Sequence, residues 1–219
     1  HQMFGNLMDR RLCIKAVATS LGLRPFVTSA QAQFVEGKHY VVISPRQPTK
    51  SPKQVEVLEF FAYGCGHCNA FEPAIDAWQK RLPPDVAFRR IPVAFREVPG
   101  VVHQRLYFAI ESLGLVEQLH RKVFTAIHVD RQRLDKPKDI GEFVARNGVD
   151  QRRFMDTFGS VSVAIKAKQA TALVSGYKVE GTPSMGVDGR WLTSGSMAGH
   201  NEGSLAVADY LISMAKKGA

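Results

Sequence analysis

The sequence is poor in cysteine, with only three among 219 residues: Cys13, Cys65 and Cys68. So few cysteines exclude a small scaffold held together by several disulfides. They also fall short of a closed zinc site, which needs four ligands. The scattered histidines do not supply the missing ligands, because they lack the H-x3–5-H spacing of such sites. We therefore predict no metal site.

The sequence also has a deficit of acidic residues and no long hydrophobic run. Asp and Glu number 20 against 29 Lys and Arg, which gives a formal net charge of +9. The basic residues are spread along helical segments and do not cluster with stacking aromatics, so we predict a solvated cationic surface and no nucleic-acid partner. The apolar stretch Leu12–Leu23 contains Lys15 and is too short to span a bilayer.

The N-terminal 32 residues have the pattern of a secretory signal peptide. A basic segment precedes the apolar stretch, and Ser29–Ala32 contains an A-x-A-like cleavage signal. Cleavage after Ala32 would remove Cys13 and leave no odd thiol in an oxidising compartment. We predict a signal peptide over residues 1–32; a disordered extension is the alternative. Because His1 is not a natural start, the first few residues are expected to be a tag remnant.

The most informative segment is the C-x-x-C motif Cys65-Gly66-His67-Cys68. It follows an apolar, β-rich run and begins an amphipathic helical pattern. Free N–H groups and the dipole at a helix N-terminus favour the thiolate of Cys65, and Cys68 lies close enough to form a disulfide with it. Structural zinc sites use the same spacing, but here the other ligands are missing. A redox-active pair is therefore predicted.

The pattern before residue 100 indicates a strand–helix–strand unit. We predict strands at Val55–Phe61 and Val86–Phe95 and a helix at Cys68–Leu82, with the two strands parallel. The spacing of apolar residues then predicts only helices. These helices are expected at Val102–Leu113, Val116–Ile127, Lys138–Asn147 and Gln151–Val174.

The pattern returns to β-structure near the C-terminus. Thr182–Leu192 predicts two strands around an Asp188-Gly189 turn, and Ser204–Lys216 predicts a closing helix. The sequence therefore predicts an α/β protein whose sheet is interrupted by helices.

These motifs in combination resemble the DsbA-type periplasmic disulfide oxidoreductases. The resemblance covers essentially all of residues 33–216 and implies a thioredoxin-like fold with an inserted all-helical domain. We expect the first part of the thioredoxin-like domain at 33–99, the helical insertion at 100–174 and the second part at 175–219. One departure is the dipeptide Gly66-His67, as in protein disulfide isomerases, where many DsbA proteins have Pro-His. Isomerase activity therefore stays open.

The residues and the resemblance together suggest roles at the site. We predict that Cys65 is the nucleophile, that Cys68 resolves the mixed disulfide, and that His67 adds a donor or a positive charge. Glu59 interrupts an apolar strand, so we predict a buried carboxyl group that exchanges protons with a leaving thiol. A surface glutamate paired with a lysine is the alternative. The resemblance places a charge partner for Glu59 at Arg90.

Thr182-Pro183 has a separate predicted role. Only about one X-Pro bond in twenty is cis in folded proteins, so the sequence alone favours trans. The resemblance implies the opposite: a cis-proline facing the disulfide, with the Thr182 backbone free to pair with an extended substrate.

The resemblance implies an enzyme that donates the Cys65–Cys68 disulfide to unfolded or newly exported proteins in the periplasm. A DsbB-like membrane oxidase would then reoxidise it, and no cofactor is expected. The alternatives are a disulfide isomerase or reductase of the same fold and a non-catalytic peptide-binding chaperone module. DsbC-type isomerases are dimers with an added N-terminal domain, for which the segment before the first strand is too short, so we expect a monomer.

Overall fold

The computed structural model describes residues 34–95 and 97–218. The predicted signal peptide lies outside the described residues. The strands are β1 (Val41–Val42), β2 (Val55–Phe61), β3 (Val86–Pro92), β4 (Ser184–Val187) and β5 (Trp191–Ser194). The helices are α1 (Gly66–Lys80), the π-helix η1 (Glu97–Val101), α2 (Val102–Ser112), α3 (Val116–His128), α4 (Pro137–Arg146), α5 (Gln151–Phe158), α6 (Val161–Gly176), α7 (Gly195–Ala198) and α8 (Asn201–Lys216).

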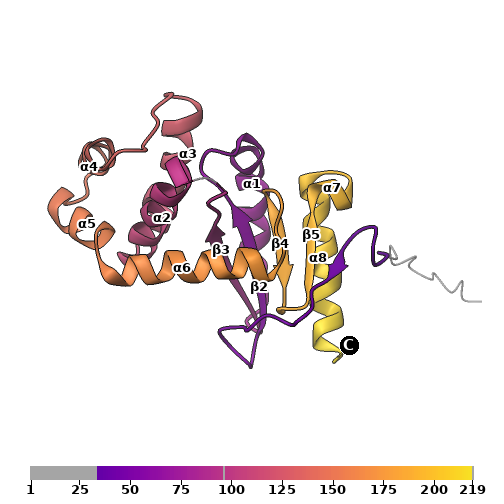
Figure 1. Cartoon of the computed structure of the whole chain (residues 1–219). Helices are drawn as coiled ribbons and strands as arrows, with labels where there is room; N and C mark the ends of the chain where they lie inside the picture. The colour runs from indigo at the N-terminus through magenta and orange to yellow at the C-terminus, as the bar shows by residue number, and fades with distance from the viewer. Residues whose placement is uncertain (1–33, 96, 219) are drawn as a thin grey trace, which may run out of the picture. The chain divides into compact units, whose positions relative to one another are not determined.

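The five strands form one mixed sheet in the order β1-β5-β4-β2-β3 (Figure 1). β2 and β3 are parallel, as predicted, and their register places Glu59 opposite Arg90. The pairs β2–β4, β4–β5 and β1–β5 are antiparallel. β2 is buried from Glu56 to Phe61, which explains its nearly continuous apolar run.

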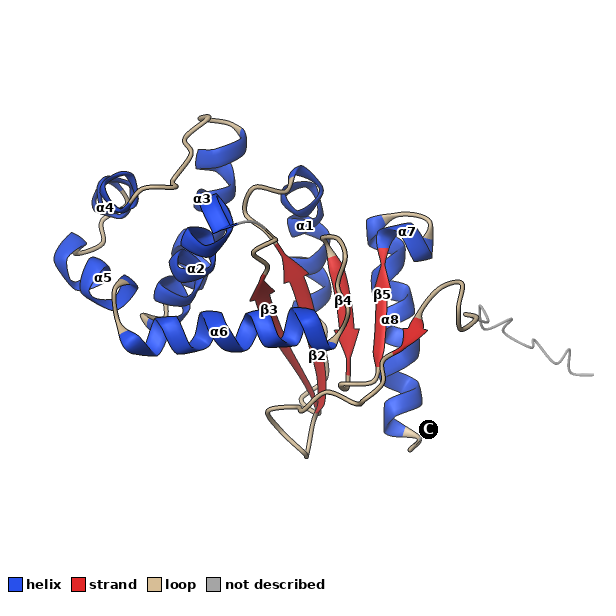
Figure 2. Ribbon diagram, viewed as in Figure 1, coloured by secondary structure: helices blue, strands red, loops and turns tan. Residues whose placement is uncertain are grey.

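Two hydrophobic clusters cover the sheet. One contains Phe71 and Trp78 of α1 together with Leu211 of α8, and these two helices contact each other. Figure 2 shows α8 running along β5. The other cluster contains Phe60 and continues into α2, α3 and α6. The sheet and the inserted helices therefore share a continuous apolar interior.

The inserted helices α2 to α6 all lie between β3 and β4 in the chain, and α2 to α5 gather at the end away from α7 (Figure 1). The prediction of one helix over Gln151–Val174 is wrong. The chain breaks at Gly159 and Ser160, and the Ser160 hydroxyl accepts a hydrogen bond from the backbone N–H of Val163 at 3.2 Å, which starts a new helix. The boundaries at 99/100 and 174/175 stay predictions.

The predicted hairpin is confirmed. Asp188 and Gly189 both have positive φ values, 54° and 69°, as a tight two-residue turn between twisted strands requires. Among the helices at residues 34–95 and 97–218, none is both long and apolar enough to cross a membrane.

Candidate active site

The turn between β2 and α1 sets the positions of the two thiols. Cys65 is the N-cap of α1, and its Sγ accepts a hydrogen bond from the Cys68 backbone N–H at 3.4 Å. Cys65 is partly exposed, whereas Cys68 is fully buried. The two sulfurs are free thiols, so the structure describes the reduced state.

The environment of Cys65 favours its thiolate. Hydrogen bonding from the Cys68 side chain, which outweighs the opposing effect of burial, lowers the pKa of Cys65 to about 5. The Thr182 side chain and the backbone N–H groups of Cys68 and His67 act in the same direction. In the protonated state, the Cys65 thiol instead donates to the Thr182 carbonyl oxygen at 3.3 Å. At neutral pH the anion is the dominant form.

Cys68 has the opposite character. Its hydrogen bond to Cys65, its burial and the neighbouring Cys65 charge together raise the pKa of Cys68 far above its ordinary value. When it is ionised, the nearby Glu59 carboxylate adds to this increase. The pair is therefore one exposed thiolate beside one buried, protonated thiol, an asymmetry suited to attack at Cys65.

His67 contributes through its backbone. Its backbone N–H is one of the groups that stabilise the Cys65 thiolate. Its side chain is exposed and lines the groove beside Thr182 and Pro183 that is described below. The predicted side-chain contribution of His67 stays a prediction.

The Thr182–Pro183 peptide bond is cis, as the resemblance implied and against the expectation from the sequence alone. It lies beside Cys65, because the Thr182 carbonyl oxygen is the acceptor for that thiol. A groove of about 610 Å³ begins here and is lined by residues from the segment before β4, from β5, from α7 and from the start of α8. Its polar lining side chains include Lys178, Glu180, Ser194, Ser196, His200, Asn201 and Glu202.

Glu59 is fully buried on β2, as predicted, and Arg90 lies opposite it on β3. The Arg90 Nε atom is 3.1 Å from Glu59 Oε2. Burial, supported by the charges of Glu72 and Asp76, raises the pKa of Glu59 to about 8 despite the lowering effect of Arg90. At neutral pH this carboxyl group therefore holds a proton.

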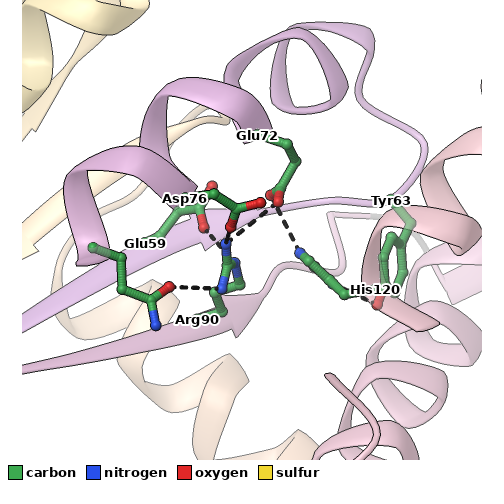
Figure 3. A network of polar contacts seen from close by, with 7 residues as sticks. Glu59, Tyr63, Glu72, Asp76, Arg90 and His120 are labelled. Carbon is green, nitrogen blue, oxygen red and sulfur yellow. Dashed lines mark hydrogen bonds and ion pairs between the residues drawn. The ribbon is translucent and has the colours of Figure 1, made fainter. Parts of the chain in front are cut away.

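Other polar residues around Arg90 were not predicted from the sequence (Figure 3). Arg90 contacts Glu72 at 3.3 Å, Asp76 at 2.7 Å and Gln79 at 3.2 Å, all on α1. Glu72 also contacts His120 of α3 at 3.2 Å. One local signal was available: Glu72 lies next to Phe71, inside the buried face of α1. The contact with α3 had no local signal, because it depends on how the helices pack.

No group of three or more His, Cys, Asp or Glu side chains in the part of the chain that the structure describes is arranged to hold a metal ion.

Comparisons with known proteins agree with this geometry. The family model described as DSBA-like thioredoxin domain matches residues 56–201. The chain belongs to this family. It is 36% identical over 207 residues to a thiol:disulfide interchange protein DsbA of Azotobacter vinelandii, covering 93% of this chain and 96% of that one. It is 41% identical over 193 residues to the protein of the same name from Bordetella parapertussis, covering 88% and 90%.

A crystal structure of Pseudomonas aeruginosa DsbA superposes with a TM-score of 0.82 at 37% identity, covering 84% of this chain and 96% of that one. The expected fold, thioredoxin-like with a helical insertion, is thereby confirmed. The chain is a DsbA-like thiol:disulfide oxidoreductase.

Proposed function

We propose that this DsbA-like enzyme donates the Cys65–Cys68 disulfide to the thiols of newly exported proteins in the periplasm. The observation that carries the proposal is the asymmetry of the pair: Cys65 is partly exposed with a pKa of about 5, and Cys68 is buried with a raised pKa. A stabilised Cys65 thiolate favours the reduced enzyme, which makes its disulfide a better oxidant.

The exchange proceeds in two balanced steps. A substrate thiolate attacks Cys65 Sγ, a mixed disulfide forms, and the Cys65–Cys68 bond breaks with its electron pair on Cys68. The buried Cys68 thiolate takes the proton that Glu59 holds. A second substrate thiolate then attacks the substrate sulfur and releases Cys65 as a thiolate. Two substrate thiolates become one disulfide, and the enzyme gains two electrons.

Substrate recognition is assigned to the segment opposite the thiols. Thr182 lies next to the Cys65 sulfur, and the Thr182–Pro183 bond opens onto the 610 Å³ groove. An extended substrate segment would pair with the Thr182 backbone there, with its cysteine held over Cys65. Because polar side chains and the apolar Pro183, Leu192 and Met197 line the groove together, we expect it to accept many unfolded sequences.

Reoxidation is assigned to a DsbB-like membrane oxidase, and the enzyme is proposed to act as a monomer. An isomerase would use the same exchange chemistry, and the Gly66-His67 dipeptide keeps that activity open. A chaperone module would not need a reactive Cys65.

Cysteine labelling separates these functions. We expect an alkylating reagent to label Cys65 rapidly even near pH 6, because the thiolate is already formed there. The oxidised protein should also oxidise a reduced, unfolded substrate in a single turnover. Slow labelling at that pH together with no substrate oxidation would favour the chaperone, whereas efficient rearrangement of scrambled disulfides would favour the isomerase.

A further inference from the structure

His120 connects the helical insertion to the carboxyl groups near the cysteine pair. It lies on α3 and is 2% exposed. Its Nδ1 atom is 2.8 Å from the Tyr63 hydroxyl oxygen, and its Nε2 atom is 3.2 Å from Glu72 Oε1 (Figure 3). Glu72 Oε2 in turn lies 3.3 Å from Arg90 Nη2. One imidazole ring therefore connects Tyr63, in the loop that precedes Cys65, to Glu72 and through it to Arg90.

The surrounding groups determine which ring nitrogen of His120 carries the proton. Burial lowers the pKa of His120, and the nearby Arg90 charge adds to that effect, so the ring is neutral. Burial raises the pKa of Tyr63, so its hydroxyl keeps its proton. Among residues 34–95 and 97–218, His120 Nδ1 is the one hydrogen-bond partner of this hydroxyl, so the hydroxyl donates a hydrogen bond to Nδ1. The proton of the ring is then on Nε2, which donates to Glu72.

Three carboxyl groups share the single charge of Arg90. Asp76 is 38% exposed and faces a cavity of about 270 Å³, so solvent screens its charge. Glu59 and Glu72 are both fully buried. Two buried carboxylates beside one cation cannot both ionise easily, and one of them keeps a proton.

The hydrogen bonds distinguish these two carboxyl groups. Glu72 receives one hydrogen bond from His120 and another from Arg90. Glu59 lies within ion-pair distance of Arg90, but no donor among residues 34–95 and 97–218 is aligned with either of its oxygens. Hydrogen bonds to a carboxylate favour its ionised form, so Glu72 is the better place for the negative charge.

We propose that His120 is a positioning residue that decides which buried carboxyl group holds the proton. By donating to Glu72 it keeps that group ionised against Arg90, and so it leaves the proton on Glu59. The location of the proton follows from these contacts and from burial, whereas its use in the exchange rests on the proposed function.

The titratable or charged groups that make up or face the Glu59–Glu72–Arg90–His120 cluster come from five elements and one loop. They are Glu59 on β2, Tyr63 in the loop before α1, Glu72 and Asp76 on α1, Arg90 on β3, Tyr107 on α2, and His120 and Arg121 on α3.

The test is a carboxyl carbon NMR titration of the full, reduced protein labelled at glutamate. Glu59→Gln and Glu72→Gln variants assign the two resonances. In the wild type, Glu59 should titrate well above Glu72. In His120→Phe, Glu72 loses its donor and its pKa should rise, while the pKa of Glu59 should fall by about one unit or more as Arg90 turns to it.

Two further variants separate positioning from mere packing. His120→Gln keeps an N–H close to the position of Nε2, so it should restore the wild-type order, whereas the shorter His120→Asn should behave like His120→Phe. The matched control is His103→Phe: His103 is also buried and packs against Tyr63, but its hydrogen bond goes to the Arg133 carbonyl. This control should leave both titrations unchanged.

An unchanged Glu59 titration in folded His120→Phe would overturn the proposal. If that variant does not fold, identical titrations in the Gln and Asn variants would overturn it. The role of Glu59 is tested separately by the single-turnover rate of Glu59→Gln. A normal rate there contradicts the role of Glu59 and leaves the assignment of the proton intact.

Discussion

The Cys65 thiolate should make the stability of the reduced protein depend on pH in a way that the oxidised protein does not share. The folded pKa is about 5, whereas an unfolded cysteine titrates near pH 8.5. Because the folded pKa is the lower one, the thiolate's contribution is fully present above the unfolded pKa and is lost as the pH falls through about 5. The disulfide form has no thiolate and lacks this contribution.

The size of the effect follows from the pKa difference. One pKa unit is worth about 1.4 kcal/mol, so a thiolate formed two units below pH 7 contributes at most about 2.7 kcal/mol there. Cys65 is partly exposed, and solvent screening reduces this to about 1–2 kcal/mol. Opposing it, closure of the short Cys65–Cys68 loop stabilises the oxidised form by about 2 kcal/mol in the chain-entropy model. The thiolate and loop-closure contributions nearly cancel at neutral pH. The test is therefore how the stability difference between the two redox forms changes with pH.

The assay is urea unfolding of both redox forms between pH 5 and pH 8. We expect the free energy of unfolding of the reduced form, minus that of the oxidised form, to rise by about 2 kcal/mol over this range. The reduced form should be the more stable one at pH 8. Reduced Cys65→Ala is the control and should lose the rise. A difference that stays constant with pH would refute the reasoning, because it would mean that Cys65 is a protonated thiol at neutral pH.

Four further predictions concern individual residues. Cys65→Ser should abolish thiol oxidation, whereas Cys68→Ser should accumulate mixed disulfides with substrates on non-reducing gels; the reverse pattern would exchange the two roles. Glu59→Gln should slow single-turnover peptide oxidation by about 10²-fold and leave the thiolate absorbance titration of Cys65 near pH 5 unchanged, because Glu59 is already protonated there. The same variant should be about 1–3 kcal/mol more stable at pH 7, a gain that disappears below about pH 4.5, where an unfolded glutamate is protonated too; equal stability at pH 7 would contradict the raised pKa. His67→Ala should raise the pKa of Cys65 only by the contribution of the imidazole, because the backbone N–H of residue 67 remains; an unchanged titration would contradict the predicted side-chain role.

The features that sequence alone predicted have local causes. The C-x-x-C motif follows an apolar run and opens an amphipathic helix, so its position at the start of α1 could be read from neighbouring residues. The buried position of Glu59 was visible as one acidic residue that interrupts an apolar strand. The hairpin followed from Asp188-Gly189, since few dipeptides accept two positive φ values.

The features that were missed depend on packing between distant segments. The contact of His120 with Glu72 joins α3 to α1, and no periodicity in either helix shows which faces meet. The break between α5 and α6 was missed because apolar spacing continues across it, while the capping Ser160 was not recognised. The short strand β1 and helix α7 contain too few residues for a pattern to appear.

The central claim is that the Cys65–Cys68 pair is a disulfide donor, and its equilibrium with glutathione tests this most directly. The oxidised protein is incubated in glutathione redox buffers, and the fraction reduced is measured after acid quenching. The account predicts an equilibrium that lies towards reduced protein and oxidised glutathione, and that shifts back towards the protein disulfide as the pH falls to about 5. An equilibrium that favours the protein disulfide at neutral pH, as expected for a reductase, would contradict it.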